Sequence, residues 1–210
     1  PVSGAQTTVS SGGGFVDPAG IALDANGDIL LADFEGHSGS GTGTVYRVDP
    51  ITGDQTTIST GGSLEDPFGI AVDANGDILV ADFGNFESVA PGGTGSIFRI
   101  DPLTGSQTVI STGGNLIDPA GIVLDANGDI LVADFQAFGG GCPVGCGGII
   151  RVDPITGTQT TISTGGRFVN PIGIALDVSE NIVVGDADAF GGGGGILQVD
   201  PVTGLQTTIS

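Results

Sequence analysis

Four copies of one unit make up most of this chain, and a fifth copy of the unit's last segment precedes them. Each unit opens with Asp-Pro-x-Gly, and successive openings are 49, 52 and 52 residues apart. The openings are Asp17, Asp66, Asp118 and, with Asn replacing Asp, Asn170. The last segment, Gln-Thr-Thr-Ile-Ser or a close variant, starts at Gln6, Gln55, Gln107, Gln159 and Gln206. This period is typical of propeller-like arrays, in which one unit alone cannot bury its apolar face.

Four short strands are expected in each unit. In the first unit, apolar or β-branched runs cover residues 20–24, 28–33, 45–48 and 55–59. Asn26-Gly27 predicts a hairpin because both residues tolerate positive φ, and Pro50 ends the third strand because it cannot donate to a ladder. We find no helical periodicity. The sequence therefore predicts an all-β protein, a propeller-type array of four four-stranded antiparallel blades with one surplus outer strand. The single array spans 1–210, with blades at about 15–62, 63–114, 115–166 and 167–210 and the extra strand within 1–14.

The charge of the chain is strongly negative. There are 24 acidic side chains against four Arg and no Lys, which gives a net charge of −20. Such a surface repels nucleic acid and anionic lipid, so we expect neither as a partner. No apolar run reaches the 18 residues of a membrane span, so no membrane insertion is expected. The charge suits an extracellular or cell-surface protein in a medium that contains cations, although solubility alone would also explain it.

The two cysteines, Cys142 and Cys146, lie in the segment Gly-Cys-Pro-Val-Gly-Cys. A zinc site needs about four ligands, and the single histidine, His37, belongs to a different unit. The Cys-x-x-Cys spacing of redox motifs is absent. We therefore predict a disulfide that closes a small loop, which is typical of an oxidising compartment.

The densest group of carboxylates is the pattern Asp-x-Asn-x-Asp in the first three units. Its residues are Asp24, Asn26, Asp28, Asp73, Asn75, Asp77, Asp125, Asn127 and Asp129. The pattern resembles the opening of calcium loops, where alternate oxygen ligands converge on one cation, but the Glu that completes an EF-hand is missing. The alternative is a hairpin turn whose Asp and Asn bond to nearby backbone amides. Ca²⁺ is therefore the one cofactor that the sequence suggests.

Other charged positions also recur from unit to unit. We expect the strand-end aspartates to cap turn amides between blades; they are Asp33, Asp82, Asp134 and Asp186. A ring of carboxylates that binds cations is the alternative, since like charges held together repel. Arg47, Arg99 and Arg151 share one position in the third strand, and we expect each to pair with carboxylates across blades.

The Gln-Thr-Thr-Ile-Ser strands carry no charge and no Pro, the usual protections of a sheet edge. Five such strands accompany four blades, so two of them compete for one edge. Either the ring is larger, or one strand pairs with another subunit by strand addition. The candidate assembly segments are Thr7, Thr8, Val9 and Ser10 at one end and Thr207, Thr208, Ile209 and Ser210 at the other.

The pattern PxGIAxDxxGDIxVAD, followed by a strand that ends in Arg-Val-Asp, resembles the NHL-repeat propellers and the streptogramin lyase-like and gluconolactonase-type propellers. The resemblance implies that the GIALD strand is innermost and the QTTIS strand outermost in each blade. In the enzymes it implies a divalent metal held by Glu, Asn and Asp, or a catalytic His with a metal. Here His37 lies in a variable loop, and the four Glu occupy unrelated positions: Glu35, Glu65, Glu87 and Glu180.

Catalysis needs different groups in different roles, whereas this sequence is nearly symmetric. We therefore predict no catalytic residues and an extracellular structural or adhesive protein. It would be a homo-oligomer or filament subunit assembled by strand exchange and stabilised by Ca²⁺. One alternative is a metal-dependent lyase or lactonase. Another is a ligand-binding module that uses the loops between the second and third strands, which alone vary in length.

Overall fold

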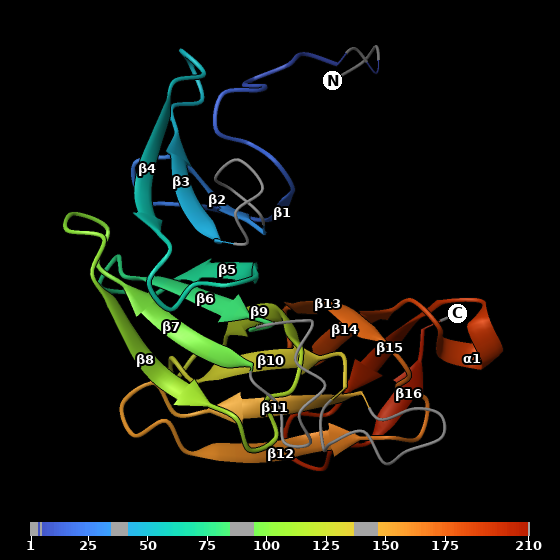
Figure 1. Ribbon diagram of the computed structural model, residues 1–210. Coiled ribbons are helices and arrows are strands. Elements are labelled where there is room, and N and C mark those ends of the chain that lie inside the picture. Colours follow the sequence, from blue (N-terminus) through green and yellow to red (C-terminus); the bar gives the residue numbers. More distant parts are fainter. Residues whose placement is uncertain (1–3, 5, 35–41, 85–94, 137–146, 210) are drawn as a thin grey trace.

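The computed structural model describes residues 4, 6–34, 42–84, 95–136 and 147–209, and it is built almost wholly of β-strands (Figure 1). Blade 1 contains β1 (Pro18–Leu23), β2 (Ile29–Asp33), β3 (Thr44–Val48) and β4 (Gln55–Thr60). Blade 2 contains β5 (Pro67–Val72), β6 (Ile78–Asp82), β7 (Ser96–Ile100) and β8 (Gln107–Thr112). Blade 3 contains β9 (Pro119–Leu124), β10 (Ile130–Asp134), β11 (Gly148–Val152) and β12 (Gln159–Thr164). Blade 4 contains β13 (Pro171–Leu176), β14 (Ile182–Asp186), β15 (Gly195–Val199) and β16 (Gln206–Thr208).

Each blade is an antiparallel meander whose strands pair in chain order. The blades succeed one another as in a β-propeller, and their first strands, β1, β5, β9 and β13, pack side by side. The predicted fold is thus confirmed, with GIALD-type strands inside and QTTIS-type strands outside. A short helix, α1 (Ala189–Gly192), follows β14. In the described residues, no helix is long and apolar enough to cross a membrane.

The core lies between blades, because every strand alternates its side chains between two neighbours. Leu79, Ala81 and Ile97 of blade 2 pack against Ile122, Ile130 and Val132 of blade 3, and each of the six is buried. Equivalent clusters join blade 1 to blade 2 and blade 3 to blade 4. We call the side of a blade that faces the preceding blade its first face, and the other side its second face.

Glycine at the third residue of β1, β5 and β9 lets each of these blades approach the next one closely. A methyl group on Gly20 would collide with the carbonyl oxygen of Phe68, and one on Gly69 with that of Ala120. The Gly of the Asp-Pro-x-Gly motif is therefore required for packing between blades. A carbonyl oxygen of the next blade occupies the space that a side chain at this position would need.

A polar lattice joins the outer parts of neighbouring blades. The Ser59 hydroxyl of β4 donates to the Gly105 carbonyl of blade 2 at 2.9 Å, and Gln107 Nε2 donates back to Ser59 Oγ at 3.0 Å. The same pattern recurs between blades 2 and 3 and between blades 3 and 4. The Ser and Gln of the QTTIS segment are thus parts of the inter-blade contact.

The N-terminal copy of this segment makes the same contacts without forming a strand. Residues 6–9 are irregular, yet Ser10 Oγ donates to the Gly53 carbonyl at 2.7 Å, and Gln55 Nε2 donates to Ser10 Oγ at 3.0 Å. The Tyr46 hydroxyl donates to the Gly14 carbonyl, and its ring meets Phe15 edge to face. The segment therefore docks on blade 1 as the outer strand of a preceding blade would.

Candidate functional site

The Asp-x-Asn-x-Asp segments form the turns that join the first and second strands of blades 1 to 3. In blade 2, Asp73 Oδ1 accepts the backbone N–H of Asn75 at 2.8 Å and that of Asp77 at 3.0 Å. Gly76 has φ +89°, which glycine adopts without strain. The predicted metal ligands therefore lie at turns, and the first Asp of each carries the turn's hydrogen bonds.

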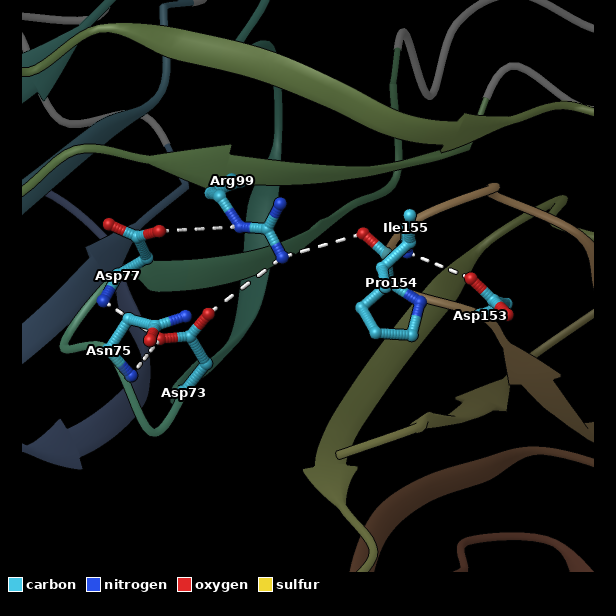
Figure 2. A network of polar contacts seen from close by, with 7 residues as sticks. All are labelled: Asp73, Asn75, Asp77, Arg99, Asp153, Pro154 and Ile155. Atoms are coloured by element: carbon cyan, nitrogen blue, oxygen red, sulfur yellow. Dashed lines mark hydrogen bonds and ion pairs between the residues drawn. The ribbon is translucent and has the colours of Figure 1, made fainter. Parts of the chain in front are cut away.

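An arginine from the third strand faces the two carboxylates of each turn (Figure 2). Arg99 Nη2 lies 3.8 Å from Asp73 Oδ2, and Arg99 Nε lies 3.5 Å from Asp77 Oδ2. Arg47 and Arg151 hold the same place in blades 1 and 3. These ion pairs lie within one blade, so the expected pairing across blades is wrong. The reason is the antiparallel register: Leu79 pairs with Arg99, which brings Arg99 over the turn of its own blade.

Arg99 also reaches the next blade. Its Nη2 donates to the Pro154 carbonyl of blade 3 at 3.4 Å (Figure 2). Pro154 belongs to the turn after β11, where Asp153 Oδ1 accepts the Ile155 N–H at 2.9 Å. One guanidinium thus pairs with both carboxylates of a turn in blade 2 and bonds to a turn of blade 3.

In blade 4 the same cluster is built without arginine. Asp177 keeps the position of the first Asp, and its Oδ2 accepts hydrogen bonds from Asn181 Nδ2 at 3.0 Å and Gln198 Nε2 at 2.9 Å. These hydrogen bonds, with that of Asn181 leading, hold the pKa of Asp177 below its ordinary value. Glu180 occupies the glycine position with φ +62°.

The strand-end aspartates are buried and serve the start of their own blade. Asp134 Oδ2 accepts the Ile117 N–H at 2.9 Å, and its Oδ1 accepts the N–H groups of Gln136 at 3.0 Å and Asp118 at 3.3 Å. Desolvation by burial raises the pKa of Asp134 to about 7, against the opposing effect of these bonds. Desolvation likewise raises the pKa of Asp82 to about 6. The predicted capping of turn amides is observed, on the segment that enters each blade.

The aspartates that precede proline cap a different turn. Asp101 Oδ1 accepts the N–H of Thr104 at 2.8 Å and that of Leu103 at 2.9 Å. These bonds, with that of Thr104 leading, lower the pKa of Asp101, and equivalent bonds lower the pKa of Asp49, Asp153 and Asp200. These repeated carboxylates thus accept hydrogen bonds from the backbone N–H groups of the turns.

Carboxylates with a shifted pKa can mark active sites. The strand-end aspartates, however, recur from blade to blade with equivalent backbone partners. Among the described residues, no three His, Cys, Asp or Glu side chains are placed to hold a metal ion. Binding of Ca²⁺ stays a prediction, and the cation would have to compete with a guanidinium at each turn. His37, Cys142 and Cys146 lie outside the described residues, so the disulfide also stays a prediction.

Sequence reasoning missed an aromatic group near the first strands. The rings of Phe68 and Phe83 stack with centroids 4.9 Å apart, and Phe34 meets Phe83 edge to face at 6.0 Å. The available signal was the Phe that follows the strand-end Asp in the first three units. It was overlooked because an aromatic next to a turn has no periodic pattern.

Two segments of the chain, residues 15–38 and 64–87, match the model of the NHL repeat. These two segments are NHL repeats. Each match runs from the start of a blade through its second strand, so it covers the turn and strand-end aspartates described above. No curated protein matches the sequence.

Solved structures resemble the array of four blades in fold. Virginiamycin B lyase from Staphylococcus aureus has 15% identity and a TM-score of 0.63 over 90% of this chain and 54% of its own. A gluconolactonase from Xanthomonas campestris has 16% identity and a TM-score of 0.64 over 92% of this chain and 62% of its own. A hydrazine synthase from Kuenenia stuttgartiensis has 19% identity and a TM-score of 0.65, over 97% and 51%. The chain thus spans 51–62% of these three relatives, and at such identities the likeness shows the fold alone.

Proposed function

We propose that this NHL-repeat chain is a non-catalytic structural or adhesive protein of the extracellular surface, and that copies of it assemble into a filament. The observation that carries the proposal is the docked N-terminal segment. Ser10 and Gln55 anchor an outer-strand sequence on blade 1, while the blade to which such a strand would belong is absent from the described residues. Such a segment can add as a strand to the sheet of a neighbouring copy.

The repeated polar groups support the non-catalytic part of the proposal. The turn carboxylates bind amides and Arg, and the strand-end carboxylates bind amides that enter the same blade. A reaction would need one blade to differ from the others in the groups it presents. Blade 4 does differ: its Asp177 cluster replaces ion pairs by amide hydrogen bonds, and its added carboxylate, Glu180, accepts the backbone N–H of Ala126 in blade 3.

The assembly proposal is tested with the purified protein. Sedimentation velocity over a hundredfold concentration range should show growth of the species, and electron microscopy should show filaments at the high end. A protein that stays a monomer at the highest concentration contradicts the proposal.

The alternative enzymatic function follows from the fold neighbours, which include a lyase and gluconolactonases. It is tested by incubating the protein with Mg²⁺, Mn²⁺ or Ca²⁺ and either a streptogramin B or glucono-1,5-lactone. Turnover that is lost on chelation would favour this alternative. The ligand-binding alternative depends on the variable loops, most of whose residues lie outside the described part of the chain.

A further inference from the structure

Blade 1 presents an uncovered apolar first face. Its Ile21 and Leu23 are 66% and 64% exposed. The equivalents of Ile21 in blades 2 and 3, Ile70 and Ile122, are 6% and 8% exposed because the preceding blade covers them. The outer part of the same face is covered: Tyr46 is 3% exposed beneath the N-terminal segment.

Blade 4 presents the opposite half of the same contact. Its Ile196 is 51% exposed on the second face, whereas the equivalent Ile97 and Ile149 are fully buried against the next blade. A methyl group on Gly173 would meet open space, although the equivalent Gly121 lies against the carbonyl of Ile172. Blades 1 and 4 lie at opposite ends of the array (Figure 1).

We propose that the second face of blade 4 docks on the first face of blade 1 in a second copy of the chain, and so repeats the interface that joins the blades. This inference rests on the proposed self-assembly and specifies its surface. A second copy is the occupant because the chain itself carries both halves. At the three interfaces inside the chain, the second face of one blade packs against the first face of the next blade. The contact is heterologous, so each copy keeps one free face for the next.

The outer strand at this junction comes from the N-terminus of the second copy. That segment is already anchored on blade 1, where Ser10 and Gln55 make the bonds that Ser59 and Gln107 make inside the chain. The strand of the first copy that occupies the same place is β16, which pairs with β15. In the docked state we expect residues 6–10 of the second copy to replace β16 beside β15.

The contact is heterologous, so the rotation from one copy to the next decides whether the assembly is a closed ring or an open filament. A heterologous contact whose rotation does not close generates an open helical filament.

Charged substitutions on the two faces test the interface. Ile196→Glu should disable the second face and Ile21→Arg the first, each weakening self-association at least tenfold in sedimentation velocity. Because each variant keeps one intact face, an equimolar mixture should form 1:1 dimers that do not grow. Ile155→Glu is the matched control, since Ile155 is 92% exposed in the turn between β11 and β12. The control should assemble like the parent.

The outcomes separate this inference from the proposed function. If the parent assembles and both face variants assemble equally well, the interface is wrong while self-assembly stands. If the parent stays monomeric, both fail. Gly173→Leu provides a second test of blade 4, because the added side chain enters open space in the free chain and would block only the docked state. Unchanged melting temperatures show that the variants are folded.

Discussion

Gln198 donates a hydrogen bond from Nε2 to Asp177 Oδ2 at 2.9 Å, at the strand position that Arg99 occupies in blade 2. The replacement of Arg by Gln in the third strand is accompanied by a second replacement in the turn, where blade 4 has Asn181 and blade 2 has Asp77. Two aspartates and one arginine in blade 2 are thus replaced by one aspartate and two amides in blade 4, where Glu180 also stands at the glycine position of the turn. The fold builds this turn with either set of partners.

The first prediction follows from this relationship. Arg99→Gln leaves two carboxylates without their cation and should lower the free energy of unfolding by roughly 0.5–1 kcal/mol, the upper range for partly exposed pairs. Adding Asp77→Asn restores the arrangement of blade 4 and should recover most of that loss. The measurement is a double-mutant cycle by urea denaturation. Additive losses from the two changes would contradict charge compensation.

The second prediction concerns pH. The pKa of Asp134 is about 7 in the folded chain, against an ordinary value of 3.8 that we take for the unfolded chain. Between these values the folded state holds a proton that the unfolded state has released, so stability should fall as pH rises from about 4 to 7. Asp82, with a pKa of about 6, acts in the same direction. The measurement is the urea midpoint at several pH values.

Asp134→Asn tests the origin of that slope. Its amide replaces one accepting oxygen by a donor, so the variant should be less stable at every pH. It should nevertheless lose less stability between pH 4 and 7 than the parent does. Asp101→Asn is a control, because its lowered pKa acts only on the acidic side, where stability falls as pH drops. An unchanged slope in Asp134→Asn would place the titrating group elsewhere.

The third prediction concerns calcium. Because Arg99 already faces Asp73 and Asp77, added Ca²⁺ should raise the melting temperature of Arg99→Gln more than that of the parent. Thermal unfolding of both proteins in chelator and in millimolar Ca²⁺ measures the difference. Equal shifts in the two proteins would show that these turns do not bind the cation.

The fourth prediction concerns the N-terminal segment. Thr8→Pro removes a backbone donor and should shorten or abolish filaments, while the melting temperature stays close to that of the parent because residues 6–9 form no strand. Thr208→Pro is the matched change in β16, and it should leave assembly intact if the N-terminal segment replaces that strand. Electron microscopy at equal concentrations compares them. Filaments of normal length in Thr8→Pro would rule out this segment as the assembly strand.

Much of the blade could be predicted from local patterns. The turn at Asp24–Asp28 was visible because Asn-Gly and alternating Asp are local signals, and strand order followed from one repeated meander. The partner of Arg47 could not be predicted, because the two residues that it pairs with are about 20 positions away and their approach depends on register. The lattice of Ser59 and Gln107 was missed because it joins different blades.

The sequence by itself determined the number of blades and their four strands, because these depend on local periodicity and turn chemistry repeated along the chain. Which strand is innermost and which is outermost was predicted from the resemblance to NHL-repeat propellers. Only the tertiary structure decided which faces remain uncovered. Ile21 and Ile70 occupy the same place in the repeat, yet one is 66% exposed and the other 6%. The physical reason is that burial between blades is a property of neighbours, and a residue's own unit does not contain the surface that covers it.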